Sequence, residues 1–148
     1  MDESTIVSAA YGDVKAFKKI FDHYLPKMRP IASRYAISHL ETDDILQESF
    51  VKIYYNLKSF KFTGSFEGWI RRIVVNTSIN HYKKNKDTYL SDDIYSLEIA
   101  DTIEDDEEIN TDGGNLLNLI RELPPGYKMV LNLYVFEDYS HNDIAEML

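Results

Sequence analysis

The sequence predicts an all-α protein, and three groups of apolar residues support this prediction. Within residues 66–86, apolar side chains recur at the period of one helix face, namely Phe66, Trp69, Ile70, Ile73, Val74 and Thr77. The same period occurs in residues 14–28 and 45–57, and shorter segments of this kind follow residue 115. We therefore expect a helical domain at 1–88, an acidic flexible linker at 89–114 and a smaller helical domain at 115–148.

The composition is that of a chain that can bury a core without covalent or metal support. Of its 148 residues, 44% are hydrophobic. The absence of cysteine excludes a disulfide framework and a thiolate metal site. No apolar run approaches the roughly 20 residues of a membrane span, and the acidic N-terminus lacks a signal pattern. We expect a cytoplasmic protein with no membrane insertion and no cofactor.

The charge is distributed unevenly along the chain. The net charge of −9 argues against a nucleic-acid partner when taken alone. However, residues 60–86 contain six bases and one acid, whereas residues 87–115 contain eleven acids and no base. Because screening limits phosphate attraction to roughly 8 Å at physiological salt, the local charge of residues 60–86 matters more for contact. The global charge predicts weak binding to random DNA.

The first helices follow from the apolar spacing and its interruptions. Residues 4–11 form a short helix that ends at Gly12, and helical spacing resumes at Asp13. Pro26 and Pro30 fall inside this second pattern and each removes a backbone donor, so we expect a kink or break near 25–27. Helix then continues to about Tyr35, and residues 39–41 form a connector.

The helix from Thr42 onward has one apolar and one polar side. Asp43 and Asp44 in its first turn suit the positive end of the helix dipole. The inner side is expected to contain Ile45, Phe50, Ile53, Tyr54 and Leu57. The other side contains Asp44, Gln47, Glu48 and Lys52. By itself, such a side is either a solvated surface or a protein interface.

The helix at 66–86 has a polar row beside its apolar stripe. Ser65 stands at the N-cap position, where its hydroxyl can accept a backbone N–H. The row consists of Arg72, Asn76, Asn80 and Lys83, spaced so that the side chains share one edge. Arginine and lysine bind phosphates, and asparagine can pair with a base edge. The row indicates either a nucleic-acid interface or a solvated helix face. In the preceding turn, Phe60 and Phe62 are either core anchors or surfaces for base stacking.

The C-terminal segment predicts three short helices. The sequence LLNLIREL stops at Pro124–Pro125, and the next helix, 126–136, is expected to bury Tyr127, Val130, Leu131, Tyr134 and Val135. Ser140 and Asp143 resemble a capping box before a third helix at 142–148. There Ile144, Ala145 and Leu148 are expected to point inward. This is how a helix-turn-helix module begins, and its recognition helix is absent from the sequence.

Four stretches, in this order, resemble motifs of the extracytoplasmic-function (group four) sigma factors, the dissociable promoter-recognition subunits of bacterial RNA polymerase. They are Gly12-Asp13-x-x-Ala16-Phe17, the run from Asp43 to Lys52, Phe66-x-x-Trp69-Ile70-x-Arg72-Ile73-x-x-Asn76, and Leu123-Pro124 through Tyr139-Ser140-x-x-Asp143-Ile144-Ala145. No single motif is specific, but four in order with suitable gaps form a strong pattern over nearly the whole chain.

The resemblance implies sigma domain two at 1–88, the linker at 89–114 and a partial sigma domain four at 115–148. In such proteins, domain two binds core RNA polymerase and captures the melted non-template strand of the minus-ten element. The implied polymerase-binding residues, which meet the clamp helices of the largest subunit, are Asp44, Gln47, Glu48 and Lys52. The implied DNA-binding residues are Phe60, Lys61, Phe62 and Thr63 with Asn76 at a flipped base, and Arg72, Asn80, Lys83 and Lys84 on the backbone.

The resemblance also implies partners for the rest of the chain. Domain four would dock on the flap of the second polymerase subunit, but without a recognition helix it should not read the minus-thirty-five element. An anti-sigma factor is expected as a further partner. The acidic linker would either imitate nucleic acid in a basic channel of polymerase or only separate the domains. Trp69 is assigned to the core because it lies on the apolar stripe.

Two other classes of function compete with the sigma-factor interpretation, namely an enzyme and a helical adaptor. An enzyme is disfavoured because the chain has no cysteine nucleophile and no glycine-rich phosphate loop, and its histidines, at 23, 39, 81 and 141, are dispersed. We therefore expect no catalytic residue and no metal site. The second rival is a helical adaptor that binds polymerase without reading DNA. It would use the surface around Gln47 and Glu48 but would not need Asn76.

Overall fold

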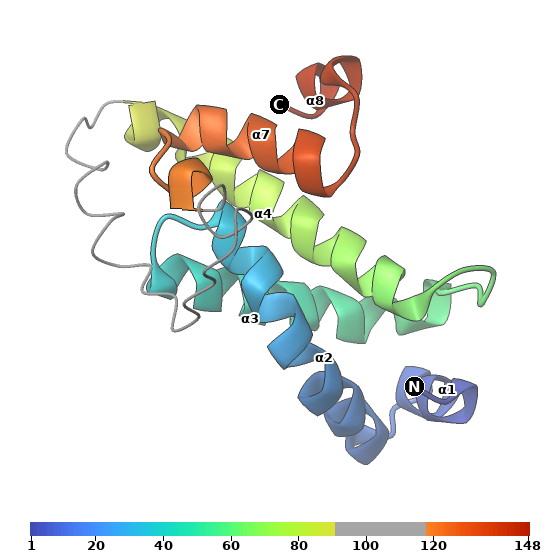
Figure 1. The fold of residues 1–148 in the computed structure, drawn as a ribbon. Coiled ribbons are helices and arrows are strands. Elements are labelled where there is room, and N and C mark those ends of the chain that lie inside the picture. Colours follow the sequence, from blue (N-terminus) through green and yellow to red (C-terminus); the bar gives the residue numbers. More distant parts are fainter. Residues whose placement is uncertain (91–117) are drawn as a thin grey trace.

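The computed structural model describes residues 1–90 and 118–148, and every regular element in these ranges is a helix (Figure 1). The predicted all-α fold is confirmed. The elements are α1 (Glu3–Ala10), α2 (Val14–Tyr35), α3 (His39–Asn56), the 3₁₀ turn η1 (Leu57–Ser59), α4 (Phe66–Leu90), α7 (Pro125–Phe136) and α8 (His141–Met147). The predicted linker lies largely outside the described residues, and its first two positions, 89 and 90, belong to α4.

The core lies where α2, α3 and α4 pack against one another. Its most deeply buried side chains are Ile20, Met28, Ile45, Ile53, Ile70 and Val74, each no more than 1% exposed. The short helix α1 closes the N-terminal end of α2 through Ile6 and Ala9. On the far side of α4, α7 lies alongside, and Met129 and Leu133 of α7 join the same core (Figure 1). The two ends of the chain therefore share one hydrophobic interior.

Helix α2 continues through both of its prolines. Of the kink or break predicted near 25–27, the break is wrong, because α2 extends from Val14 to Tyr35 with Pro26 and Pro30 inside it. Both prolines are exposed, so the carbonyls that lose their intrahelical N–H partner lie toward solvent, where water can bond them. On the opposite side, Tyr24, Met28 and Ile31 hold the helix against the core.

Helix α3 begins three residues earlier than predicted. Residues 39–41 are its first turn and not a connector, because the Ser38 hydroxyl accepts a hydrogen bond from the Glu41 N–H at 3.1 Å and caps the helix. The predicted inner side is buried except for Tyr54, which is 39% exposed. The Tyr54 ring packs edge-on against Phe17 of α2, at 5.0 Å between centroids.

Helix α4 is capped as predicted but is buried over a wider arc. The Ser65 hydroxyl accepts a hydrogen bond from the Gly68 N–H at 3.1 Å, which confirms the N-cap. Phe66, Ile70, Val74 and Thr77 of the predicted stripe are buried, while Trp69 and Ile73 are partly exposed. Val75, Ser78, Ile79 and Tyr82 are buried as well. The wider arc is explained by α7, which packs against a second side of α4.

Helix α7 faces the opposite way from the prediction. Tyr127, Tyr134 and Val135, predicted to be buried, are 71%, 48% and 42% exposed. Val130 and Leu131, predicted to be buried with them, are partly exposed. The buried residues are instead Lys128, Met129, Asn132 and Leu133. Two of these are polar, so apolar spacing could not identify the inner side; their hydrogen bonds, described below, explain their burial.

Helix α8 matches its predicted start. The Ser140 hydroxyl accepts a hydrogen bond from the Asp143 N–H at 3.1 Å, which confirms the cap. Ile144 is buried as predicted, and Leu148 is partly exposed. Ala145, predicted to point inward, is exposed. The single turn between α7 and α8 places the Tyr134 ring flat against His141, at 4.5 Å between centroids.

Candidate nucleic-acid interface and neighbouring surfaces

The polar row of α4 faces solvent along its whole length. Arg72, Asn76, Asn80 and Lys83 are exposed, and so is the neighbouring Lys84. The row lies beside the buried stripe and away from the side that α7 covers. A ligand can therefore reach every predicted member. Chemically, the row offers three cations for phosphates and two amides that can each donate and accept a hydrogen bond.

The two aromatic residues of the turn before α4 pack against each other, at 4.8 Å between ring centroids, but differ in exposure. Phe60 is partly buried against Phe66 and Trp69, at 5.1 and 5.5 Å between ring centroids, so it anchors the turn to the core. Phe62 is 42% exposed and has a φ of 58°, a backbone region that residues other than glycine seldom adopt. The Phe62 ring is therefore covered in part by Phe60 and exposed in part to solvent. Lys61 and Thr63 beside it are exposed.

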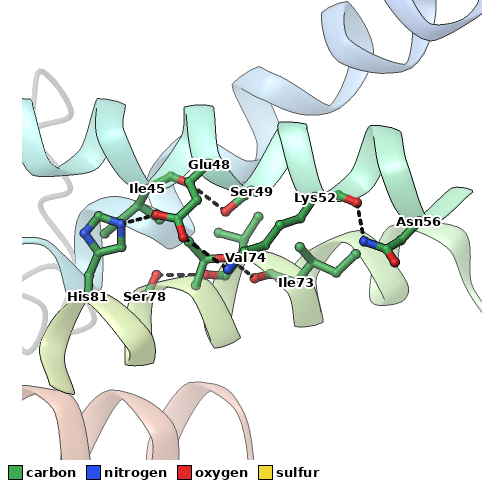
Figure 2. Close-up of polar contacts among 10 residues, drawn as sticks. Ile45, Glu48, Ser49, Lys52, Asn56, Ile73, Val74, Ser78 and His81 are labelled. Carbon is green, nitrogen blue, oxygen red and sulfur yellow. Dashed lines mark hydrogen bonds and ion pairs between the residues drawn. The ribbon is translucent and has the colours of Figure 1, made fainter. Parts of the chain in front are cut away.

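A polar network joins α3 to α4 (Figure 2). Glu48 of α3 meets Nε2 of His81 at 2.6 Å and Nζ of Lys52 at 3.3 Å. Lys52 donates in turn to the Thr77 hydroxyl at 3.3 Å. Partial burial acts to raise the pKa of Glu48, but the hydrogen bonds from His81 and Lys52 outweigh it and lower that pKa. Glu48 and Lys52 are thus turned toward α4.

The predicted polymerase-binding residues on α3 border two different hollows. Asp44 and Glu48 line a polar pocket of about 410 Å³ together with Asn80, His81 and Lys84 of α4. Gln47 lies instead at the edge of an apolar groove of about 460 Å³ between α2 and α3. The groove is lined mainly by Phe17, Phe21, Leu25, Phe50, Val51, Tyr54 and Tyr55. The predicted residues therefore lie on a part of α3 that has the apolar groove toward α2 on one side and the polar pocket toward α4 on the other.

Sequence reasoning missed the contact between α7 and the C-terminal end of α2. Nζ of Lys128 donates to the carbonyl of Ala36 at 2.7 Å, and Nδ2 of Asn132 donates to the carbonyl of Arg34 at 2.8 Å. Both carbonyls belong to the end of α2, where backbone acceptors lack intrahelical partners. Burial lowers the pKa of Lys128 to about 8, an effect to which Arg121 adds and which Glu41 opposes.

An ion pair extends this contact to α4. Nε and Nη2 of Arg71 donate to the two carboxylate oxygens of Glu137 at 3.1 and 2.7 Å, and the Tyr35 hydroxyl donates to the same carboxylate at 3.4 Å. The Arg34 guanidinium lies over the Phe136 ring at 4.4 Å. The hydrogen bonds to Glu137 raise the pKa of Arg71, and burial followed by the Glu137 charge raises that of Tyr35.

One sequence signal could have indicated the α7 contact. Lys128 and Asn132 are four residues apart and alternate with Met129 and Leu133, so polar and apolar residues share one face of a short helix. The arrangement is explained by the carbonyls at the end of α2, which lack intrahelical partners and lie opposite these two side chains. Glu137 and Arg71 are 66 positions apart, and no local pattern links them.

The described parts of the chain contain neither a metal-binding cluster nor a membrane-spanning helix. No group of three or more histidine, aspartate or glutamate side chains there could hold a metal ion. No described helix is both long and apolar enough to cross a membrane.

Comparisons with known proteins agree on one family. The chain matches the profile of Sigma-70 region 2 over residues 20–88 and that of Sigma-70, region 4 over residues 113–148. It is 30% identical to the ECF RNA polymerase sigma factor SigW of Bacillus subtilis, in an alignment that covers 100% of this chain and 85% of the relative. It is 27% identical to the ECF RNA polymerase sigma-E factor of Haemophilus influenzae (99% and 83% covered) and 28% identical to that of Escherichia coli K12 (99% and 82%).

Proposed function

Because the chain belongs to the ECF group of the sigma-70 family of transcription initiation factors, we propose that it directs polymerase to promoters by capturing one melted DNA strand on α4. The single observation that supports this proposal is the exposed row of α4, a helix that follows the turn containing the exposed Phe62. The chain supplies binding and orientation and performs no reaction of its own.

In this proposal the strand runs along α4 from the turn at 60–65 toward Lys84. Asn76 and the turn residues Phe60, Lys61, Phe62 and Thr63 receive the flipped base, and the exposed face of Phe62 stacks on it. Extruding a base costs a few kcal/mol, and one stacking contact returns roughly 1–3 kcal/mol. The remaining free energy comes from phosphate contacts of Arg72, Asn80, Lys83 and Lys84.

Core polymerase would bind on the α3 side of the molecule. We assign the clamp helices of its largest subunit to the surface of Asp44, Gln47, Glu48 and Lys52, with the apolar groove beside Gln47 as its centre. Buried apolar anchors contribute most to such interfaces, and surrounding polar groups mainly set orientation. The region at 113–148 is assigned to the flap of the second subunit, and an anti-sigma factor to the free protein.

The experiment that tests the DNA-reading function replaces Asn76 with alanine. We expect Asn76→Ala to lose at least fivefold in discrimination at one minus-ten position, about 1 kcal/mol, because the base loses a paired donor and acceptor. Affinity for core polymerase should not change. The measurement is run-off transcription with core polymerase on promoters substituted at each position, alongside a core-binding titration.

The control for Asn76→Ala is Asn142→Ala, which removes an equally exposed amide from α8. If both variants transcribe every promoter as the parent does while still binding polymerase, the adaptor reading is correct and α4 reads no base. If neither the parent nor the variants bind core polymerase, the whole assignment fails.

A second variant tests the groove. We expect Val51→Asp, at a half-exposed groove position, to weaken core binding about three- to tenfold by placing an unpaired charge in an apolar contact. Val14→Asp is the control, because Val14 is 69% exposed, outside the groove and at the start of α2, where an acid suits the helix dipole. If the two variants bind core polymerase with equal affinity, the groove is not part of the polymerase interface.

A further inference from the structure

We propose that Thr77 and His81 are positioning residues of α4, which fix the direction in which its amides face the DNA strand through their bonds to α3; this inference rests on the proposed function. The two cross-helix bonds are that of Lys52 to the Thr77 hydroxyl, at 3.3 Å, and that between Glu48 and Nε2 of His81, at 2.6 Å (Figure 2). Neither Thr77 nor His81 belongs to the exposed row, because Thr77 is buried and His81 is partly buried.

The two cross-helix bonds lie one helical turn apart. Glu48 and Lys52 of α3 meet His81 and Thr77 of α4 in reverse order, so the helices run antiparallel and the bonds are roughly 6 Å apart along them. The Glu48 carboxylate also contacts Nζ of Lys52 at 3.3 Å, which joins the two bonds into one network. A single bond would leave α4 free to pivot about one point of contact. Two bonds a turn apart oppose both a pivot and a rotation about the helix axis.

The chemistry of these bonds makes them directional. Partial burial acts to raise the pKa of Glu48, but the hydrogen bonds from His81 and Lys52 lower it, so the carboxylate is charged at neutral pH and can only accept. Nε2 of His81 therefore carries a proton and donates a hydrogen bond to Glu48. The Lys52 ammonium donates to the Thr77 hydroxyl, which donates in turn to the Ile73 carbonyl of its own helix at 2.8 Å. Such bonds weaken steeply when donor and acceptor are misaligned.

Other buried groups on the two helices do not supply this orientation. The hydroxyls of Ser49 on α3 and Ser78 on α4 are buried, and each donates within its own helix, to the carbonyls of Ile45 at 2.6 Å and Val74 at 2.9 Å (Figure 2). These two hydroxyls therefore donate no bond from one helix to the other. The apolar side chains of the core attract one another without a preferred direction, so apolar packing alone permits small rotations of α4.

Thr77 and His81 are linked to the amides of the row by their place in the sequence. Each directly follows one of these amides, Asn76 and Asn80, and adjacent residues lie about 100° apart around a helix. When α3 holds Thr77 and His81, both amides are therefore held at one angle. A rotation of α4 by about 10° would move the end of an amide, roughly 6 Å from the axis, by about 1 Å. Such a shift misaligns the paired donor and acceptor of the amide with a base edge.

The phosphate contacts of the row depend less on this angle. The ammonium groups of Lys83 and Lys84 are point charges on flexible stems, whereas an amide pairs with a base edge in one geometry. Loss of the cross-helix bonds should therefore reduce discrimination between bases and leave the salt dependence of strand binding unchanged. A variant that merely damages the fold should instead weaken core binding and strand binding together.

The experiment measures discrimination at each minus-ten position, by run-off transcription with core polymerase and the full chain on substituted promoters. We expect Thr77→Val, which keeps the shape of the side chain, and His81→Leu each to lose about two- to threefold at the position that Asn76 reads. Thr77→Ser and His81→Gln should restore discrimination, because serine keeps the hydroxyl and glutamine places an amide N–H near the position of Nε2. Glu48 and Lys52 stay unchanged in all four variants, which preserves the surface assigned to polymerase.

Ser78→Ala is the matched control for Thr77→Val. Both hydroxyls are buried on α4 and both donate to the carbonyl four residues earlier, but Thr77 in addition accepts the bond from Lys52. Ser78→Ala should therefore lower the free energy of unfolding and leave discrimination unchanged. Core-binding titrations and circular dichroism show whether each variant is folded. The salt dependence of binding to a labelled non-template oligonucleotide should equal that of the parent in every variant.

A double-mutant cycle shows whether the effect passes through Asn76. In the Asn76→Ala background, Thr77→Val should cause no further loss at the position concerned. Additive losses, or a loss in Ser78→Ala equal to that in Thr77→Val, would overturn the positioning role. So would full discrimination in both Thr77→Val and His81→Leu, and in these cases a loss in Asn76→Ala leaves the proposed function standing. If Asn76→Ala itself discriminates as the parent does, the proposed function fails, and the positioning of a base-reading amide fails with it.

Discussion

Replacing both Arg72 and Lys83 with glutamine should weaken binding of the minus-ten strand by roughly tenfold at 0.15 M salt. Each lost phosphate contact on a single strand reduces the slope of log affinity against log salt by about 0.7, so two contacts reduce it by about 1.4. Both side chains are exposed, so the change removes charge without disturbing the core. The measurement is fluorescence anisotropy of a labelled non-template oligonucleotide, titrated with the sigma–polymerase complex at several salt concentrations.

The control for this pair is Lys15→Gln with Lys19→Gln. These lysines are exposed on the first half of α2, so the double change alters net charge by the same amount away from the row. A uniform effect of overall charge would weaken binding equally in both double variants. In that case, α4 would not be the strand-binding surface, even if the affinity of the first variant fell as expected.

Raising the pH from about 8 to 9.5 should increase the free energy of unfolding through Lys128, by roughly 2 kcal/mol. The buried amine has a pKa of about 8, below its ordinary value of 10.5, because of burial and of the Arg121 charge. Between these values the unfolded chain binds the proton and the folded chain does not, so stability rises with pH. Urea unfolding at intervals across this range measures the slope.

The Lys128→Met variant should remove most of that slope, while Lys18→Met, at an exposed position, should keep it. The pH range in which stability increases ends near pH 10. Burial raises the pKa values of Tyr24, Tyr35 and Tyr82 in the folded chain, so these side chains ionise at lower pH in the unfolded chain. Their ionisation in the unfolded chain lowers stability as pH increases further. A slope in Lys128→Met equal to that of the parent would show that this amine is not buried in solution.

Local chemistry determined the features that the sequence predicted well. Hydroxyl caps at Ser65 and Ser140 depend on residues three positions away, so spacing alone identifies them. The exposed row of α4 follows from helical periodicity beside a continuous apolar stripe. The all-α fold followed from helical periodicity, and the family followed from four stretches that resemble sigma-factor motifs; both are confirmed by the structure and the comparisons.

Tertiary context determined the features that the sequence predicted wrongly. Pro26 and Pro30 signal a break, yet core packing on the opposite side keeps α2 continuous. The inner face of α7 was misassigned because Lys128 and Asn132 are buried by acceptors more than 90 positions away in the chain.

The unbroken course of α2 has a thermodynamic consequence. Its first half supplies Phe17, Phe21 and Leu25 to the apolar groove, and its last turn presents the carbonyls that hold Lys128 and Asn132. One continuous helix therefore reaches from the apolar groove to the contact with α7. A partner whose binding in the groove tilts or shifts α2 also changes the far end, which contacts α7. Reciprocity then requires that whatever docks or undocks at the far end change affinity in the groove by the same factor.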